Sequence, residues 1–266
     1  MIEPNKLKVF GISVAILIVL LPGFHFWTAA LGKDSFTFMF IMAFFFSLKN
    51  IKKNIFLLII SSIFLTLIRP YLTIFILISI VATLLFRNQF KFKFSHIIVG
   101  LFSVASLVIL LPFFKDFFYL ESFDLENLIN RTEFYNNQGA KHADGSSSYI
   151  DVSNYNLLFK MFAYFFRPLF FDAHSILQLI ISFENLFLIT LIISWLKSIK
   201  FKIFKWYRLL NLIDRIMLFY VLIGWIIMAS SMYNLGLASR QKYMFLPVLF
   251  ILIFKNFNRD VYLKKA

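Results

Sequence analysis

Apolar residues in this chain fall into eight runs, separated by short basic connections and one long polar segment. The runs are Val9–Trp27, Ser35–Leu48, Ile55–Ile68, Tyr71–Phe86, His96–Phe114, Ser175–Leu196, Ile216–Tyr233 and Tyr243–Phe254. A helix satisfies its backbone hydrogen bonds internally, whereas an open strand cannot cross a lipid bilayer. We therefore predict an all-α polytopic membrane protein with about eight transmembrane helices, forming a single integral membrane domain over residues 1–266.

The long polar segment, Lys115–His174, lies between the fifth and sixth runs. Its residues 136–148 are rich in Asn, Gly and Ser, a composition typical of loops. Tyr155–Phe171 differs, because Phe, Tyr and Leu are interleaved there with few charges. We predict that residues 115–174 form an extracytoplasmic loop. Within it, Tyr155–Phe171 should contain a helix that lies at the membrane interface or docks on the bundle.

Composition supports this class and excludes others. Hydrophobic residues make up 61% of the 266 and charged residues 15%, which is more apolar surface than a soluble domain of this size needs. The chain has no cysteine, so disulfides and thiolate metal sites are excluded. The four histidines lack metal-ligand spacing, and no glycine-rich phosphate loop occurs. We expect no metal and no cofactor.

The formal net charge of +14 is explained by topology, without a nucleic-acid partner. Most Lys and Arg residues lie on one side of the predicted bundle, in residues 1–8, 49–53, 87–93, 197–215 and 255–265. By the positive-inside rule this side is cytoplasmic, together with both termini. We expect a multi-pass membrane protein with the long loop on the opposite side. Attraction of the same segments to lipid headgroups is compatible with this pattern.

The first run also has features of a signal peptide. Lys6 and Lys8 precede it, and Thr28-Ala29-Ala30 follows it. The bulky residues His25-Phe26-Trp27 and the seven further runs favour an uncleaved helix. We expect this helix to stay in the protein.

Three predicted helices are short for a hydrocarbon core of about 30 Å. Asp34–Leu48, Asn54–Ile68 and Gln241–Phe254 contain fifteen, fifteen and fourteen residues. At about 1.5 Å per residue they extend roughly 21–22 Å. Their cytoplasmic ends carry lysines, so their outer ends should lie below the outer membrane surface.

Cations occupy those outer ends. Lys33, Arg69 and Arg240 lie there, and Arg167 lies beside the loop helix. Ionisable groups at such depth usually face a bundle interior or a watered cavity, because exposure to lipid is costly. We predict that these four residues line one outward-facing pocket that binds an anion, with phosphate favoured by the planar Arg fork. Snorkelling of each side chain or a locally thinner bilayer would explain the same pattern.

Three further residues are candidates for acid–base chemistry. Glu184 lies about ten residues into the sixth run, where a carboxyl group is either functional or a protonated hydrogen-bonding group between helices. Asp172 and His174 lie at the mouth of that run, and either is suited to act as a general base. The alternative for Asp172 is that it caps the following helix.

Several segments resemble the Wzy-like O-antigen and capsular polysaccharide polymerases. The resemblance extends from Leu21 to Pro247 and is carried by short motifs in a fixed order. They are Leu21-Pro22 to Trp27-Thr28, Leu31-Gly32-Lys33-Asp34-Ser35, Ile68-Arg69-Pro70-Tyr71-Leu72, Phe166-Arg167-Pro168-Leu169, Asp172-Ala173-His174, Phe183-Glu184-Asn185-Leu186, Ala238-Ser239-Arg240-Gln241-Lys242-Tyr243 and Leu246-Pro247. Members of this family usually have ten or more spans. We therefore expect either a compact variant or a chain that lacks an N-terminal part.

The resemblance implies a glycosyl-transfer enzyme that polymerises oligosaccharide units (O-antigen, capsule or exopolysaccharide) carried on undecaprenyl diphosphate. It would act at the outer face of the bacterial cytoplasmic (inner) membrane. Because the diphosphate is already an activated leaving group, no cofactor is needed. The expected substrate-binding residues are Lys33, Arg69, Arg131, Arg167 and Arg240. The expected catalytic residues are Asp172, His174 and Glu184. Partners would be the lipid-linked oligosaccharide, membrane lipids, a chain-length regulator and a flippase.

Two other function classes stay open. A transporter or flippase would pass an anionic lipid-linked glycan through the same cavity, although no internal repeat or paired broken helices support it. A non-catalytic subunit of a polysaccharide export complex would fit the short chain. Loss of long glycan with short glycan retained would indicate the enzyme, whereas loss of all surface glycan would indicate transport.

Overall fold

The structure is a computed structural model. It describes residues 8–9, 12–13, 16, 20–29, 31–86, 150, 152, 155–232 and 234–263, with side chains between residues 16 and 255. The predicted fifth run, His96–Phe114, lies outside the described residues, as does most of the predicted loop, including Arg131 and residues 136–148.

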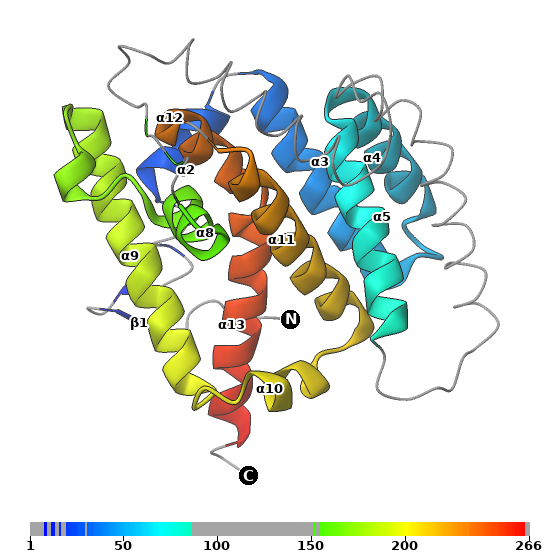
Figure 1. Ribbon diagram of the computed structural model, residues 1–266. Helices are drawn as coiled ribbons and strands as arrows, with labels where there is room; N and C mark the ends of the chain where they lie inside the picture. Colours follow the sequence, from blue (N-terminus) through cyan, green and yellow to red (C-terminus); the bar gives the residue numbers. More distant parts are fainter. Residues whose placement is uncertain are drawn as a thin grey trace.

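The described part of the chain is almost entirely helical (Figure 1). Its α-helices are α2 (Pro22–Thr28), α3 (Lys33–Ser47), α4 (Ile55–Ile68), α5 (Pro70–Leu85), α8 (Leu157–Phe166), α9 (Ile176–Ser198), α10 (Ile203–Leu209), α11 (Leu212–Ser230), α12 (Leu235–Gln241) and α13 (Leu246–Leu263). Short 3-10 turns are η1 (Leu48–Asn50), η2 (Phe170–Asp172) and η3 (Lys242–Met244). The strands β1 (Lys8–Val9) and β2 (Ile12–Ser13) pair antiparallel.

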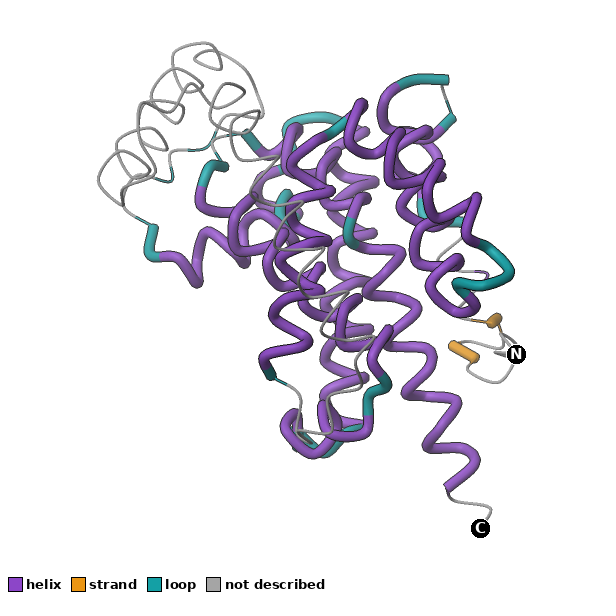
Figure 2. The backbone as a smooth tube through the Cα atoms, turned by 90° about the vertical axis from the view of Figure 1, so that its right-hand side faces the viewer, coloured by secondary structure: helices purple, strands orange, loops and turns teal. Residues whose placement is uncertain are grey.

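Helix α11 lies at the centre of the packing and contacts α5, α8 and α13. Gly224 makes the contact with the α12–α13 bend close, because a Cβ at this position would lie 2.1 Å from the Phe245 ring. Phe245 is fully buried there, and its ring lies 5.4 Å from that of Tyr220. On one side α3 pairs with α4, and α4 with α5; on the other α9 packs on α13 and α8 (Figure 1). Figure 2 shows the described helices packed side by side, seen at 90° to that view.

Two described helices are each long and apolar enough to cross a membrane, α9 with 23 residues and α11 with 19. The number rises to four if each of two bent pairs is one span. The first pair joins α2 to residues 33–50 with a bend of 108°, and the second joins residues 235–244 to 246–255 with a bend of 51°. The all-α class is confirmed and the helices fit a membrane protein, whereas eight spans remain a prediction.

Two predicted helices differ from those observed. Val9–Trp27 is not one helix, since β1 and β2 lie at its start and α2 begins only at Pro22, where a fixed φ suits a first helical turn. Gln241–Phe254 is not an isolated short helix either. Helical structure extends from Leu235 through a bend to Leu263. The bend falls before Pro247, which cannot donate a helical backbone hydrogen bond.

The helix predicted within Tyr155–Phe171 is present as α8. Asn156 caps its N-terminus, because the Asn156 side chain accepts a hydrogen bond from Phe159 N at 2.9 Å. The helix ends before the cis Arg167-Pro168 bond. Residues 163–166 are buried. Trp225 of α11 donates to the Met161 carbonyl at 2.8 Å, so α8 docks on the bundle. Because η2 separates it from α9, it is no continuation of that helix.

Candidate functional site

Asp34, Arg69 and Arg240 form one charged cluster where three segments meet. Asp34 lies in the first turn of α3, Arg69 between α4 and α5, and Arg240 in the last turn of α12. Arg69 Nη2 donates to Asp34 Oδ1, and Arg240 Nε donates to Asp34 Oδ2. One carboxylate therefore holds two guanidinium groups, and the cluster retains a net positive charge.

Local sequence explains the position of two of these residues. Arg69 precedes Pro70, and a residue before proline is disfavoured in the helical region. Arg69 accordingly has φ −148° and ψ 81°, which ends α4 and begins α5. Asp34 lies in the first turn of α3, where the helix dipole stabilises a carboxylate.

Buried tyrosines surround the inner side of Arg69. Arg69 Nη1 donates to Tyr71 Oη at 2.6 Å, and Tyr71 Oη lies 3.7 Å from Met244 Sδ. Tyr220 Oη donates to the Met244 carbonyl at 3.2 Å, and both Tyr164 and Tyr220 are fully buried. Only 15% of the Arg69 side chain is exposed. Arg69 is thus held between the carboxylate and the core, with little freedom to move.

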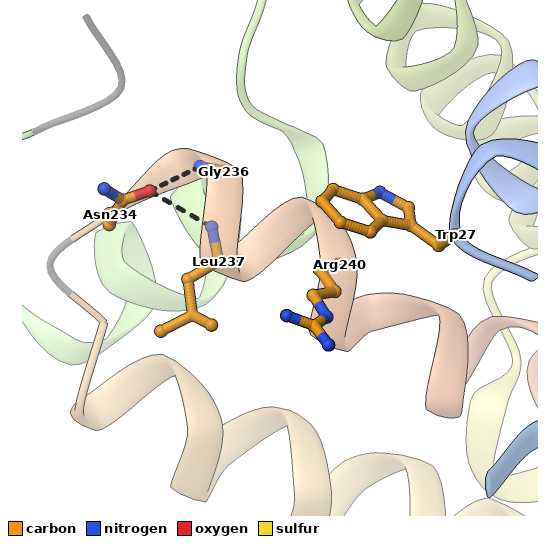
Figure 3. Close-up of a pocket in the computed structure, with 5 residues that line it drawn as sticks. All are labelled: Trp27, Asn234, Gly236, Leu237 and Arg240. Atoms are coloured by element: carbon orange, nitrogen blue, oxygen red, sulfur yellow. Dashed lines mark hydrogen bonds between the residues drawn. The ribbon is translucent and has the colours of Figure 1, made fainter. Parts of the chain in front are cut away.

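Arg240 is the more accessible of the two arginines. Its side chain is 40% exposed, and it lines an open hollow of about 290 Å³ with Trp27, Asn234, Gly236 and Leu237 (Figure 3). Its Cζ lies 5.5 Å from the Trp27 ring centroid, within cation–π distance. Among the described residues, neither Nη1 nor Nη2 of Arg240 has a hydrogen-bond partner. The fork of Arg240 is therefore positioned by two groups and still has donors for a ligand.

A second charged cluster is enclosed between α9, α2 and the α12–α13 bend. Glu184 of α9 is 3% exposed and accepts hydrogen bonds from Gly23 N, at 2.8 Å, and from Tyr243 Oη. The next residue, Asn185, accepts from the fully buried Lys242 Nζ and donates to the Pro168 carbonyl at 2.9 Å. These partners all belong to the protein itself, so this cluster joins helices.

The enclosed cluster also positions the walls of the hollow. Gly23 lies one turn before Trp27 on α2, and Tyr243 lies three residues after Arg240. A Cβ on Gly23 would lie 2.0 Å from Tyr243 Oη and 2.8 Å from Glu184 Oε2, so only glycine fits this approach. Glu184 thus fixes the separation of the two segments that present Trp27 and Arg240.

Arg167 forms its own ion pair apart from that cluster. Its Nε donates to Asp172 Oδ2 at 2.8 Å, its Nη2 to Asp172 Oδ1 and its Nη1 to Tyr155 Oη at 3.1 Å. The hydrogen bond to Asp172 raises the pKa of Arg167. Burial opposes ionisation of Asp172, but hydrogen bonds from Arg167 and from Leu169 N outweigh it and lower the pKa of Asp172.

Several predicted site residues lie elsewhere than expected. Asp172 does not cap α9; Ser175 does, by accepting from Gln178 N at 3.3 Å, while Asp172 is part of η2. His174 is exposed beside this turn, and its backbone N–H donates to Gln178 Oε1 at 2.6 Å. Lys33 is exposed at the start of α3. Of the four cations predicted to share a pocket, Arg69 and Arg240 meet at one carboxylate, and of these four only Arg240 lines the hollow.

The sequence interpretation did not assign roles to Trp27, Asp34, Tyr243 or Lys242. All four stand inside the motifs that carry the family resemblance, which was the one available signal. The described residues contain no group of three or more His, Cys, Asp or Glu side chains placed to hold a metal ion. No family model matches the chain, and neither a curated protein nor a solved structure does.

Proposed function

We propose that this chain is a membrane enzyme that polymerises oligosaccharide units carried on undecaprenyl diphosphate, at the outer face of the bacterial cytoplasmic membrane. The observation that supports the proposal best is the fork of Arg240, which Asp34 and Trp27 hold over an open hollow and whose Nη1 and Nη2 have no hydrogen-bond partner among the described residues. A planar fork suits bidentate contact with a phosphate group. In this proposal Arg240 binds the departing diphosphate, and Arg69 adds positive charge from behind.

The chemistry needs one bond formed and one broken. A hydroxyl group of the acceptor unit attacks the anomeric carbon of the donor, the bond from that carbon to the diphosphate oxygen breaks, and a base takes the hydroxyl proton. Asp172 is engaged by Arg167, whereas the exposed His174 beside it is available. We assign His174 as the proposed base. Residues from separate motifs meet in one place, which supports the proposed relation to the Wzy-like polymerases. These residues are Trp27, Asp34, Arg69 and Arg240.

Surface-glycan length in a deletion strain tests this function. Wild-type protein should restore long chains, and Arg240→Ala, expressed to the same level, should leave single units only. Lys52→Ala serves as the control because Lys52 is an exposed cation in the α3–α4 connection. Loss of all surface glycan on deletion would instead favour the transporter. If the double variant Arg69→Ala/Arg240→Ala still restores long chains, the chain is better explained as a non-catalytic subunit of an export complex.

A further inference from the structure

The connection between α9 and α11 joins the two helices that are each long and apolar enough to span a membrane. Residues 199–211 form this connection and contain α10. Helix α10 lies at the opposite end of the molecule from α12 (Figure 1), and residues of α12 line the hollow. When α9 and α11 span a bilayer, this connection must lie at one of its two faces.

The last turn of α9 and the connection together carry five cations and no acid. From Lys197 to Leu210 the basic residues are Lys197, Lys200, Lys202, Lys205 and Arg208, and all five are exposed. Within the described residues none of them forms an ion pair. The nearest following acid, Asp214, is buried and pairs with Lys255. The positive charge of this surface is therefore not neutralised from within the described part of the chain.

Large apolar side chains share this surface. Phe204 is 85% exposed and Phe201 64%, and Ile203 and Leu209 are about half-exposed. Within α10, Trp206 is buried, while Phe204 and Arg208 lie on the opposite side of the helix at i and i+4. Exposed phenyl rings beside cations suit a bilayer interface, where the rings can enter the apolar layer while the long Lys and Arg side chains keep their charges among the headgroups. An aqueous environment would suit the exposed lysines but not the exposed phenyl rings.

The surface is held in a defined position. Trp206 packs edge-on against Trp195 with ring centroids 4.9 Å apart, and Tyr207 Oη donates to the Phe86 carbonyl at 3.0 Å. Lys200 and Phe201 have φ of 52° and 54°, a left-handed conformation that is uncommon for residues other than glycine. These two residues reverse the chain at the end of α9, and the anchored α10 follows at once.

We propose that residues 197–209 bind anionic phospholipid at the bilayer face on which they lie. The five cations contact headgroup phosphates, while Phe201 and Phe204 enter the boundary between headgroups and acyl chains. Charge complementarity selects this partner, because five cations that form no ion pair within the described part of the chain, beside exposed phenyl rings, suit an anionic surface with an apolar layer directly below. The inference does not depend on the proposed glycosyl transfer, since it concerns the other end of the molecule.

The absence of cysteine allows a site-specific test. The full chain with Phe204→Cys would carry a fluorescent label and be reconstituted in phosphatidylcholine vesicles containing phosphatidylglycerol. Quenching by nitroxide-labelled phosphatidylglycerol is compared with quenching by nitroxide-labelled phosphatidylcholine. We expect the anionic lipid to quench at least about threefold more strongly. Leu209→Cys repeats the measurement with Phe204 intact, and thermal unfolding checks that each variant is folded.

Charge removal gives the matched comparison. Replacing Lys200, Lys202, Lys205 and Arg208 with Gln together should bring the two quenching signals to equality, as should salt of about 1 M. Removing Lys49, Lys52 and Lys53 in the same way, from the α3–α4 connection, should leave the preference at residue 204 unchanged.

Three results would overturn the proposal. Equal quenching by the two lipids would show that no anionic headgroup is selected. A label that neither lipid quenches would show that the surface faces water or a protein. Loss of the preference in inorganic phosphate, but not in chloride of equal ionic strength, would assign the surface to a free phosphate ion.

Discussion

The Asp34 cluster and the Glu184 cluster differ in how completely their donors and acceptors are used. Around Glu184 and Asn185, the carboxylate and the amide make hydrogen bonds to Gly23, Tyr243, Lys242 and Pro168, and the surroundings exclude solvent. Around Asp34, by contrast, Arg240 uses one nitrogen on the carboxylate and directs a half-exposed fork at a hollow.

This difference indicates that the Asp34 cluster is suited to bind a ligand and the Glu184 cluster to stabilise the fold. A buried charge is tolerated when its hydrogen bonds are complete, and removal of one partner is then costly to folding. A charge with unused donors at an open surface costs less to keep and can accept a ligand. Substitutions in the Asp34 cluster should therefore reduce activity more than stability, and those in the Glu184 cluster should affect stability first.

The largest expected effect is that of Arg240→Ala on polymerisation. Loss of the fork should reduce the rate about 100-fold or more, since it removes a charge-assisted donor from the departing diphosphate. Arg240→Lys should restore only part of the rate, because a single ammonium cannot reproduce bidentate contact. Polymer formation is measured with purified protein and lipid-linked units, alongside thermal unfolding. Arg69→Ala should behave similarly but lose some stability.

If the Arg240→Ala protein is inactive only because it is unfolded at the assay temperature, Arg240 supports the fold and the proposed difference between the two clusters is wrong. The proposed difference is equally wrong if the variant keeps the wild-type rate.

Gly23→Ala should have the next largest effect. The added Cβ would lie 2.0 Å from Tyr243 Oη, which forces Tyr243 from Glu184 and costs about 1–3 kcal/mol in the free energy of unfolding. Tyr243→Phe in the same chain should recover part of this loss, because it removes the closest atom. Denaturant unfolding of the single and double variants measures the coupling. Strictly additive losses would mean that the two residues do not meet.

Within the enclosed cluster, Glu184→Gln and Lys242→Met should differ in size. Glu184 accepts hydrogen bonds from Gly23 N and Tyr243 Oη. In the Glu184→Gln variant the amide oxygen can keep Gly23 N while the N–H₂ group donates to Tyr243 Oη, which leaves the buried tyrosine O–H without an acceptor, at a cost of about 1–3 kcal/mol. Lys242→Met leaves the buried Asn185 Oδ1 without its donor but also removes the desolvation penalty of the buried charge, so the net loss of stability should be smaller, about 1 kcal/mol. Unfolding measurements compare them. A stable Lys242→Met protein without activity would give Lys242 a direct role in the reaction.

The smallest effect concerns pH. The pKa of Asp172 is lowered in the folded protein, so the Arg167–Asp172 pair contributes its full stabilisation above the unfolded carboxyl value, about 3.9. This contribution is lost as the pH falls through the lower folded value. Asp172→Asn should lose the contribution at neutral pH and show a weaker decrease in stability between about pH 5 and pH 2. If the free energy of unfolding depends on pH in the same way in the wild type and in the variant, the Arg167–Asp172 pair does not contribute to the loss of stability in acid.

Sequence periodicity and composition predicted the all-α class and the helix within Tyr155–Phe171. The motif Arg69-Pro70 placed an arginine at a helix boundary, because proline restricts the residue before it. The prediction of the helix cap failed at the start of α9, where two residues of capping type lie close together. Both Asp172 and Ser175 precede an apolar run, and only Ser175 caps α9, since Asp172 is engaged by Arg167.

What the sequence determined by itself is therefore local: helix periods, proline boundaries, and the concentration of cations at helix ends. The pairing of Asp34 with Arg240, 206 residues apart, came only from the tertiary structure. So did the assignment of Glu184 to support and of Arg240 to the hollow. Backbone rules act over one or two turns, whereas these pairings depend on how α2, α3, α9 and α12 pack, which is set by close contacts such as those at Gly23 and Gly224.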